Sequence, residues 1–270
     1  MVLPSRSPER LLFIAAAECM LVIVNADDLG TSERVNERTF ELIDSGLVTS
    51  ATLIANAPAF EAAAKQLKAF PKCSFGVHLN LTALPPVGPS RGLEPILDDN
   101  GHMSGKLFSV AMTPTLRAAL LRELIAQVER EREFGVPISH FDSHQHVHTL
   151  PKLFSVLKAL QRRFSVRKVR TTRNLFAPDR TPSRIHTLRK RIFDVALRSV
   201  YCTKSTEGFG EFRDFYSTVK AGRLERLRSL ELMVHPGTSD SRYNEETALL
   251  SSGWYQYLPS DFIFGSYHLL

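Results

Sequence analysis

The sequence predicts an α/β protein in which helices cover a parallel sheet. Apolar and β-branched segments at 21–24, 48–54 and 73–81 alternate with amphipathic segments at 33–45 and 59–70. This βαβαβ order is typical of a parallel sheet, because a helix connects each strand to the next and packs on the sheet. The length of 270 residues fits one large domain, and α/β barrels often have this size.

The same alternation continues through the second half of the chain. A long helix is predicted at 114–134, where Gly135 and Pro137 end it, and a strand follows at 138–142. The later predicted elements are a helix at 150–164, a strand at 166–170, a helix at 183–201 and a strand at 230–234. We therefore expect a single catalytic domain over 21–270, preceded by a poorly ordered extension over 1–20.

A long segment rich in Pro, Gly and Asp interrupts the pattern at 82–112. A loop of this length inside a compact domain usually has a function. We expect it to serve as a lid, as the contact of a homodimer, or as both.

Composition and cysteine content limit the class of protein. The chain is 43% hydrophobic and 23% charged, and no apolar run has the length of a transmembrane helix, so no stable membrane insertion is expected. Its three cysteines are odd in number and lack CxxC spacing, which argues against a disulfide framework. A reducing compartment, the cytoplasm, is the expected location.

Chemically active residues follow four of the predicted strands. The motifs are NADD after the first strand, HLN in the third, HFDSHQHVH after the fourth and HPG after the strand at 230–234. In parallel α/β proteins the active site lies at the carboxyl ends of the strands. This coincidence predicts that the four motifs meet in one site.

Asp27 and Asp28 place two like charges side by side at the end of the first strand. Two neighbouring carboxylates in a site of low dielectric stay ionised most easily when a cation lies between them. One Asp would then bind a metal ion while the other acts on its bound water. The alternative is that Asp28 caps the following helix with Thr31 or Ser32, while Asp27 faces solvent.

Histidines supply the remaining candidate metal ligands. His78 lies in FGVHLNLT, and the segment HFDSHQHVH contains Asp142 and four more imidazoles, at positions 140, 144, 146 and 148. A catalytic metal site needs three protein ligands and an open position for water. The alternatives are a core histidine at 78 and a histidine-rich surface turn at 140–148. His235, after the late strand, is a candidate general acid or a turn residue.

These motifs, together with VNERTFELIDSGLVTSATLIANAPAFEAA, resemble the YdjC family of carbohydrate deacetylases over roughly residues 21–240. The resemblance implies a deformed (β/α) barrel related to the polysaccharide deacetylases. It also implies a metal triad of Asp28, His78 and His144, with Asp27 as general base and His235 as acid. Asp142 would orient an imidazole, or alternatively cap the local turn. His146, His148 and Asn80 would support the ligands or line the sugar site, and spacing alone leaves His146 and His148 as alternative ligands.

The function implied by this resemblance is hydrolysis of the N-acetyl group of a small acetylated sugar, such as a chitooligosaccharide. The ligand set suits zinc or cobalt, whereas family members are commonly described as magnesium-dependent, so Mg²⁺, Zn²⁺ and Co²⁺ all remain candidates. Another metal-dependent amidohydrolase or a phosphoesterase is the alternative enzyme, because the same metal-activated water would serve it.

A basic segment at 158–198 suggests a function of another class. It contains 13 Lys and Arg against two acids, which is a local charge of +11 in a chain of net charge +6. Such segments bind nucleic acids or anionic membrane surfaces. Apolar residues at near-helical spacing are expected to pack on the barrel and leave the basic residues in water, so no nucleic-acid partner is expected. These apolar residues are Ile185, Leu188, Ile192, Ala196 and Val200.

Overall fold

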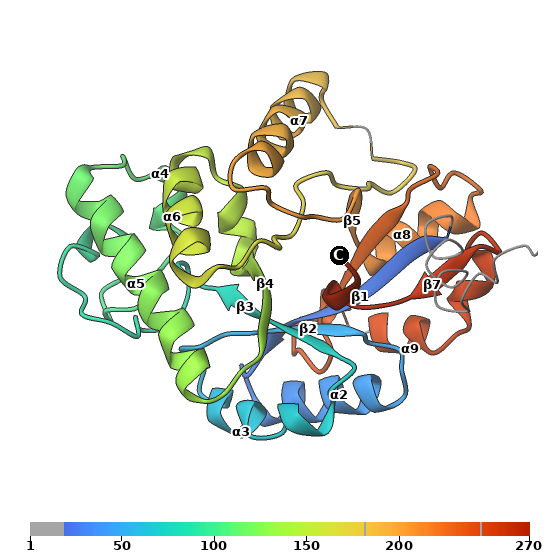
Figure 1. The fold of residues 1–270 in the computed structure, drawn as a ribbon, viewed down its shortest axis with the longest axis horizontal. Coiled ribbons are helices and arrows are strands. Elements are labelled where there is room, and N and C mark those ends of the chain that lie inside the picture. Colours follow the sequence, from blue (N-terminus) through green and yellow to red (C-terminus); the bar gives the residue numbers. More distant parts are fainter. Residues whose placement is uncertain (1–18, 181, 244) are drawn as a thin grey trace, which may run out of the picture.

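The computed structural model describes residues 19–180, 182–243 and 245–270. Its centre is a parallel sheet with the strand order β4-β3-β2-β1-β6-β5, and β7 pairs with the start of β1 (Figure 1). The strands are β1 (Met20–Leu29), β2 (Ser50–Leu53), β3 (Ser74–Leu79), β4 (Ile138–Ser143), β5 (Gly208–Glu211), β6 (Ser229–Val234) and β7 (Phe262–Phe264). The predicted parallel α/β class is confirmed. The expected extension at 1–20 lies outside the described residues up to position 18, and β1 already begins at Met20.

Helices surround the sheet (Figure 1). They are α2 (Glu33–Asp44), α3 (Phe60–Ala64), α4 (Lys106–Ser109), α5 (Pro114–Glu133), α6 (Phe154–Phe164), α7 (Arg184–Ser199), α8 (Phe212–Lys220) and α9 (Glu246–Leu250). None of these described helices is long and apolar enough to span a bilayer. Short 3₁₀ turns connect several of the elements.

Single β-bridges join the two ends of the sheet into a deformed barrel. Phe141 of β4 pairs with Val169, and Asn174 pairs with Phe209 of β5. A third bridge links Lys168 and Lys204. The predicted strand at 166–170 is therefore wrong as a regular strand, because the chain makes only isolated bridges there. It still crosses the gap between β4 and β5 at the expected position.

The strands have an apolar outer face and, toward their carboxyl ends, a polar inner face. On β1, Val22, Val24 and Ala26 belong to the main hydrophobic core, whereas Asn25 and Asp27 alternate with them and are also buried. Because neighbouring side chains on a strand point to opposite faces, this period of two separates the two environments. The same alternation on the other strands brings further buried polar residues inside, among them Thr52, His78, His140, Asp142 and Glu231. The barrel interior is thus the place where charged groups meet.

The segment at 82–112 packs on the body of the protein. Leu93, Ile96 and Leu107 are fully buried in a second hydrophobic core that includes residues of α5 and α6. A bridge between Leu97 and Met103 closes a small antiparallel turn within it. The expected roles of this segment as a lid or a dimer contact stay predictions.

The expected packing of the basic helix at 183–201 is wrong for three of its five apolar residues, whereas Ala196 and Val200 are partly buried. Helix α7 forms close to the predicted bounds, but Ile185, Leu188 and Ile192 are each more than half exposed. Leu197 is the residue of α7 that is buried. The spacing correctly indicated an apolar side, but that side faces solvent.

Close packing inside the barrel requires glycine at position 76. The ring of His140 stacks on Tyr267 with 3.5 Å between ring centroids, and it lies directly over Gly76 of β3. A Cβ atom at position 76 would approach the His140 ring to 2.6 Å and the His140 carbonyl oxygen to 2.7 Å. Since a backbone oxygen cannot swing away, the barrel interior would have to shift.

We expect Gly76→Ala to lower the free energy of unfolding by about 1–3 kcal/mol through overpacking. Urea denaturation followed by circular dichroism would measure this loss. Gly105→Ala is the matched control, because a Cβ atom at position 105 meets no atom within 4 Å. Equal midpoints for the two variants would contradict the packing argument.

Candidate metal centre

The end of β1 directs two neighbouring carboxylates toward one point. The pairing register between β1 and β2 shifts between Ala26 and Leu29, and Asp28 has a left-handed backbone with a φ of 65°. Such an irregularity interrupts the alternation of side chains along a strand. Asp28 Oδ1 and Asp27 Oδ2 consequently lie 3.3 and 4.0 Å from the same atom, Nε2 of His78.

Helix α2, which follows this turn, has a different cap. The hydroxyl of Ser32 accepts a hydrogen bond from the backbone N–H of Val35, at 3.2 Å. Thr31 binds the backbone carbonyl of Asp28 and leaves the carboxylate free for other contacts. The interpretation of Asp28 as the helix cap and of Asp27 as a solvated residue is therefore wrong, since Asp27 is 2% exposed.

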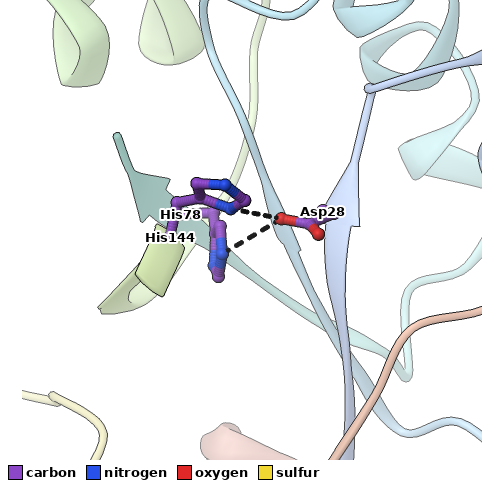
Figure 2. Close-up of side chains that lie close together, drawn as sticks. All are labelled: Asp28, His78 and His144. Carbon is purple, nitrogen blue, oxygen red and sulfur yellow. Dashed lines mark hydrogen bonds and ion pairs between the residues drawn. The ribbon is translucent and has the colours of Figure 1, made fainter. Parts of the chain in front are cut away.

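Three predicted ligands lie together in space (Figure 2). Oδ1 of Asp28 is 3.3 Å from Nε2 of His78 and 3.0 Å from Nδ1 of His144. These residues come from β1, from β3 and from the residue directly after β4, and one ligand atom of each lies within 4.8 Å of the others. His78 is buried, while about a quarter of each of the other two side chains is exposed. Two imidazoles, one carboxylate and an open side are the features of a catalytic divalent-metal site.

The other nitrogen of His78 has a fixed partner. Its Nδ1 lies 2.8 Å from Oδ1 of Asp142, whose Oδ2 accepts a hydrogen bond from the Thr52 hydroxyl at 3.0 Å. A carboxylate at Nδ1 orients the ring and leaves Nε2 directed at the cluster. This is the position that the sequence analysis expected for Asp142 as an orienting residue.

Arg170 provides the positive charge inside the barrel. Its guanidinium binds both carboxylate oxygens of Asp27, at 2.6 and 2.7 Å, and it is fully buried. It also reaches Asp142 Oδ2 at 2.7 Å and Glu231 Oε1 at 2.8 Å. Tyr267 donates a hydrogen bond to the other oxygen of Glu231. The charge of Asp27 is therefore compensated by an arginine, which leaves Asp28 as the carboxylate available to a metal ion.

The surrounding charges shift the pKa values of the cluster. Burial alone would raise the pKa of Asp27, but the positive charges of Arg170 and His78 outweigh it and hold the pKa below its usual range. Burial likewise opposes ionisation of Asp28, whose pKa is held well below its usual value by hydrogen bonds from His144 and His78. Both carboxylates are thus ionised at neutral pH.

The pKa of His78 shifts in the opposite direction, upward. Burial would lower the pKa of His78, but the negative charges of Asp142 and Asp27 raise it well above its usual value. A raised pKa of a buried histidine indicates an excess of negative charge around its ring. A divalent cation in the place of that proton would satisfy the same charge, so the donor set and its electrostatics both fit a metal ion.

His235 lies at the edge of this site, after β6. Its backbone N–H donates to Glu246 Oε2 at 2.6 Å, and its ring stacks on Tyr243 with centroids 4.1 Å apart. Burial lowers the pKa of its imidazole, while the charges of Asp27 and Asp28 act to raise it. Its Nδ1 is buried and has no hydrogen-bond partner among the described residues. Gly237, with a φ of 71°, allows the turn to contact the backbone of α2.

The other candidate residues occupy different surroundings. His148 is buried against Ser143, His140 lies between Ser139 and Tyr267, and His146 packs edge-on against Phe209. Burial lowers the pKa of His146 to about 3. These three imidazoles lie outside the groups of closely spaced ligand atoms among the described residues.

Asn80 is placed by the loop that follows β3. Its side-chain oxygen accepts hydrogen bonds from the backbone N–H groups of Thr82 and Ala83, and its amide donates to Asn56 and to the carbonyl of Ala83. All of these contacts stabilise the turn. The expected role of Asn80 at the substrate stays a prediction.

Comparison with known proteins identifies the family. A family model described as YdjC-like protein matches residues 21–259. The chain belongs to the YdjC-like family. The resemblance inferred from its motifs is thereby confirmed.

Its relatives include several enzymes named for one activity. The YdjC-like chain is 38% identical to a carbohydrate deacetylase of Geobacillus stearothermophilus over 67% of its own length and 77% of the relative. It is 32% identical to a chitooligosaccharide deacetylase of Proteus mirabilis, over 82% and 83% of the two chains. A crystal structure titled a putative cellobiose-phosphate cleavage protein of Enterococcus faecalis V583 has a TM-score of 0.75 at 21% identity. It covers 93% of this chain and 98% of that one, and it shows the shared fold.

Sequence reasoning on this YdjC-like protein missed Arg170 and Glu231. Arg170 was counted in the basic segment. It nevertheless lies at the carboxyl end of the strand predicted at 166–170, as the four motifs lie at the carboxyl ends of their strands. Glu231 is a lone acid in an otherwise apolar strand. A charged residue within a strand that is otherwise buried was the signal that could have found both.

We expect Arg170→Leu to lower the free energy of unfolding by about 3–5 kcal/mol, because removal of one partner leaves buried carboxylates without compensation. Chemical denaturation would measure the loss. Arg163→Leu is the matched control, since the ion pair of Arg163 with Glu129 is about half exposed. It should cost less than about 1 kcal/mol. If both variants lost the same stability, the buried carboxylates would not depend on the guanidinium.

Proposed function

We propose that this protein is a metal-dependent carbohydrate deacetylase, a hydrolase of carbon–nitrogen bonds other than peptide bonds. Its substrate would be a small acetylated sugar such as a chitooligosaccharide. The observation that carries the proposal is the cluster of Asp28, His78 and His144 beside the ionised, buried Asp27. The names of the relatives that share the family support the substrate class.

Asp28, His78 and His144 would hold one divalent ion, Zn²⁺ or Co²⁺ by ligand preference and Mg²⁺ by analogy with the family. When bound, such an ion lowers the pKa of a water molecule and polarises the acetamide oxygen. Asp142 would keep the His78 ring oriented, because it binds the nitrogen that faces away from the cluster.

Asp27 would act as the general base. Its Oδ1 accepts hydrogen bonds from Asn25 and Arg170, whereas its Oδ2 accepts from Arg170 alone and faces the cluster. Oδ2 can therefore take a proton from the water that attacks the acetamide carbonyl carbon. Arg170 keeps this carboxylate ionised and in place, so it positions the base without touching the substrate.

His235 would protonate the leaving nitrogen as the carbon–nitrogen bond breaks. An amine leaves readily only when its nitrogen carries this proton, and the products are then acetate and the free amino sugar. Burial lowers the pKa of the imidazole, so His235 would first take up a proton from solvent, which the negative charges of Asp27 and Asp28 favour, and would then donate this proton to the nitrogen. The stacked Tyr243 would restrain the orientation of the ring.

A cytoplasmic location is proposed together with this function. It is supported by the three cysteines, Cys19, Cys73 and Cys202, all of which are free.

Acetate release from diacetylchitobiose by chelator-treated protein is expected to be absent and to return on addition of zinc, cobalt or magnesium. Asp27→Asn should lower the restored rate by about 10²–10⁴-fold, because the general base is lost. An enzymatic assay for acetate would follow both effects.

Asp44→Asn, an exposed carboxylate on α2, is the control for this experiment and should leave the rate unchanged. Full activity of Asp27→Asn would refute the assignment of the base. Folded, metal-bound protein that releases no acetate from this sugar, but does release phosphate from an ester, would refute the deacetylase proposal.

Asp142→Asn should weaken metal binding by about 10–100-fold. The variant keeps His78 but removes the carboxylate that orients its ring. Isothermal titration with Zn²⁺ would measure the affinity, with Asp99→Asn on the exposed loop as the control. An unchanged affinity in Asp142→Asn would show that His78 does not bind the metal in the proposed orientation.

A further inference from the structure

Helix α7 attaches to the protein by Leu197 and Phe193, which pack on the second hydrophobic core, and by a set of polar contacts. The Thr171 hydroxyl donates to Asp194 at 2.7 Å, and the Thr172 hydroxyl donates to the backbone carbonyl of Lys190 at 3.1 Å. Arg198 donates to the backbone carbonyl of Thr206 at 2.7 Å. Amphipathic helices on globular proteins usually bury their main apolar row, whereas the apolar row of α7 at 185–195 faces solvent.

A buried lysine fixes the carboxyl end of the same helix. Nζ of Lys158, on α6, donates to the backbone carbonyls of Leu197 and Val200 at 2.7 and 2.9 Å. A cation at this end satisfies helix carbonyls that have no partner within the helix, and it complements the helix dipole. The orientation of α7 is therefore determined by several specific contacts.

The side of α7 that faces solvent carries a continuous apolar stripe. Ile185, Leu188, Ile192 and Val195 are 66%, 59%, 61% and 65% exposed. They account for four of the nine exposed large apolar side chains among the described residues, and their spacing of three, four and three residues places them in one row. Figure 1 shows α7 at the periphery of the molecule, apart from the sheet.

Arginines border this stripe on both sides. Arg184, Arg189 and Arg191 are exposed, and α7 as a whole contains five Lys and Arg against one acid. An exposed apolar row between cationic side chains is the pattern of helices that lie in the interface of a membrane.

We propose that α7 docks this protein onto an anionic lipid surface. The helix would lie parallel to the surface, with Ile185, Leu188 and Ile192 among the upper parts of the acyl chains and the arginines at the phosphates. This binding is peripheral and reversible. It is independent of the proposed deacetylation, because none of these residues belongs to the metal centre.

The charge pattern disfavours a second copy of the chain as the occupant. If two α7 helices paired along the apolar row, the positions that flank the row would face each other across the pair. Those positions hold Arg184, Arg189 and Arg191, so like charges would meet. A nucleic acid would neutralise the arginines but would leave the apolar row between them without a partner. An anionic membrane satisfies both features.

Co-sedimentation of the full chain with vesicles tests the proposal. We expect binding to vesicles of phosphatidylcholine mixed with phosphatidylserine, weaker binding to phosphatidylcholine alone, and a decrease as salt is raised. The double variant Leu188→Ser, Ile192→Ser should lower the partition coefficient by about tenfold or more, and Arg184→Gln with Arg191→Gln should do the same.

Two controls separate α7 from the rest of the surface. Phe108→Ser changes an exposed apolar side chain on α4, and Arg162→Gln changes an exposed cation on α6. Neither should alter vesicle binding by more than about twofold. Circular dichroism would show that all variants are folded.

Four results would overturn the proposal. Two concern vesicles: no binding to the mixed vesicles, or equal binding by the α7 variants and the parent. The third is a dimer, detected by sedimentation velocity, that dissociates in the variant Leu188→Ser, Ile192→Ser. The fourth is binding of RNA without binding of vesicles. Because acetate release is measured separately, loss of one activity is distinguishable from loss of the other.

Discussion

The guanidinium of Arg170 binds three carboxylates inside the barrel, and the geometry of the metal centre depends on this arrangement. One of them, Asp27, is held ionised beside the cluster, and another, Asp142, fixes the ring of His78. A single buried cation therefore sets both the candidate base and one candidate metal ligand. Glu231 completes the shell and connects it to Tyr267. Pairing and hydrogen bonding of these groups offset the free-energy cost of burying their charges.

Local pattern was sufficient to predict much of the fold and of the centre. The alternation of apolar and amphipathic segments predicted the parallel class, and the motifs at the strand ends predicted that they meet in one site. The family resemblance then singled out Asp28, His78 and His144 among their residues. This works because the carboxyl ends of parallel strands share one edge. The neighbouring carboxylates of Asp27 and Asp28 also correctly indicated that a cation lies close to them. Beside Asp27 this cation is an arginine, whereas the predicted metal ion would lie at Asp28.

The parts that were missed depend on partners distant in the chain. The place of Arg170 at the end of a predicted strand is a weak local signal, and its carboxylate partners lie on other strands, 143 residues before it at Asp27 and 61 residues after it at Glu231. For α7, apolar spacing indicates that one side is apolar but carries no information on which side meets the protein. On the side that meets the protein, α7 is held by hydrogen bonds of Lys158 and of the threonines at 171 and 172 and by the packing of Leu197 and Phe193.

The central pairings of this protein span long stretches of chain, and this affects how it folds. Arg170 and Asp27 are 143 residues apart, and the contact between Tyr267 and Ser74 spans 193. Closing such loops loses entropy before any contact compensates for it, so topologies of this kind fold slowly. The metal ligands are also distant in the chain, since 116 residues separate Asp28 from His144. A metal ion would consequently meet its three ligands only in the nearly native chain, and would bind late instead of nucleating the fold.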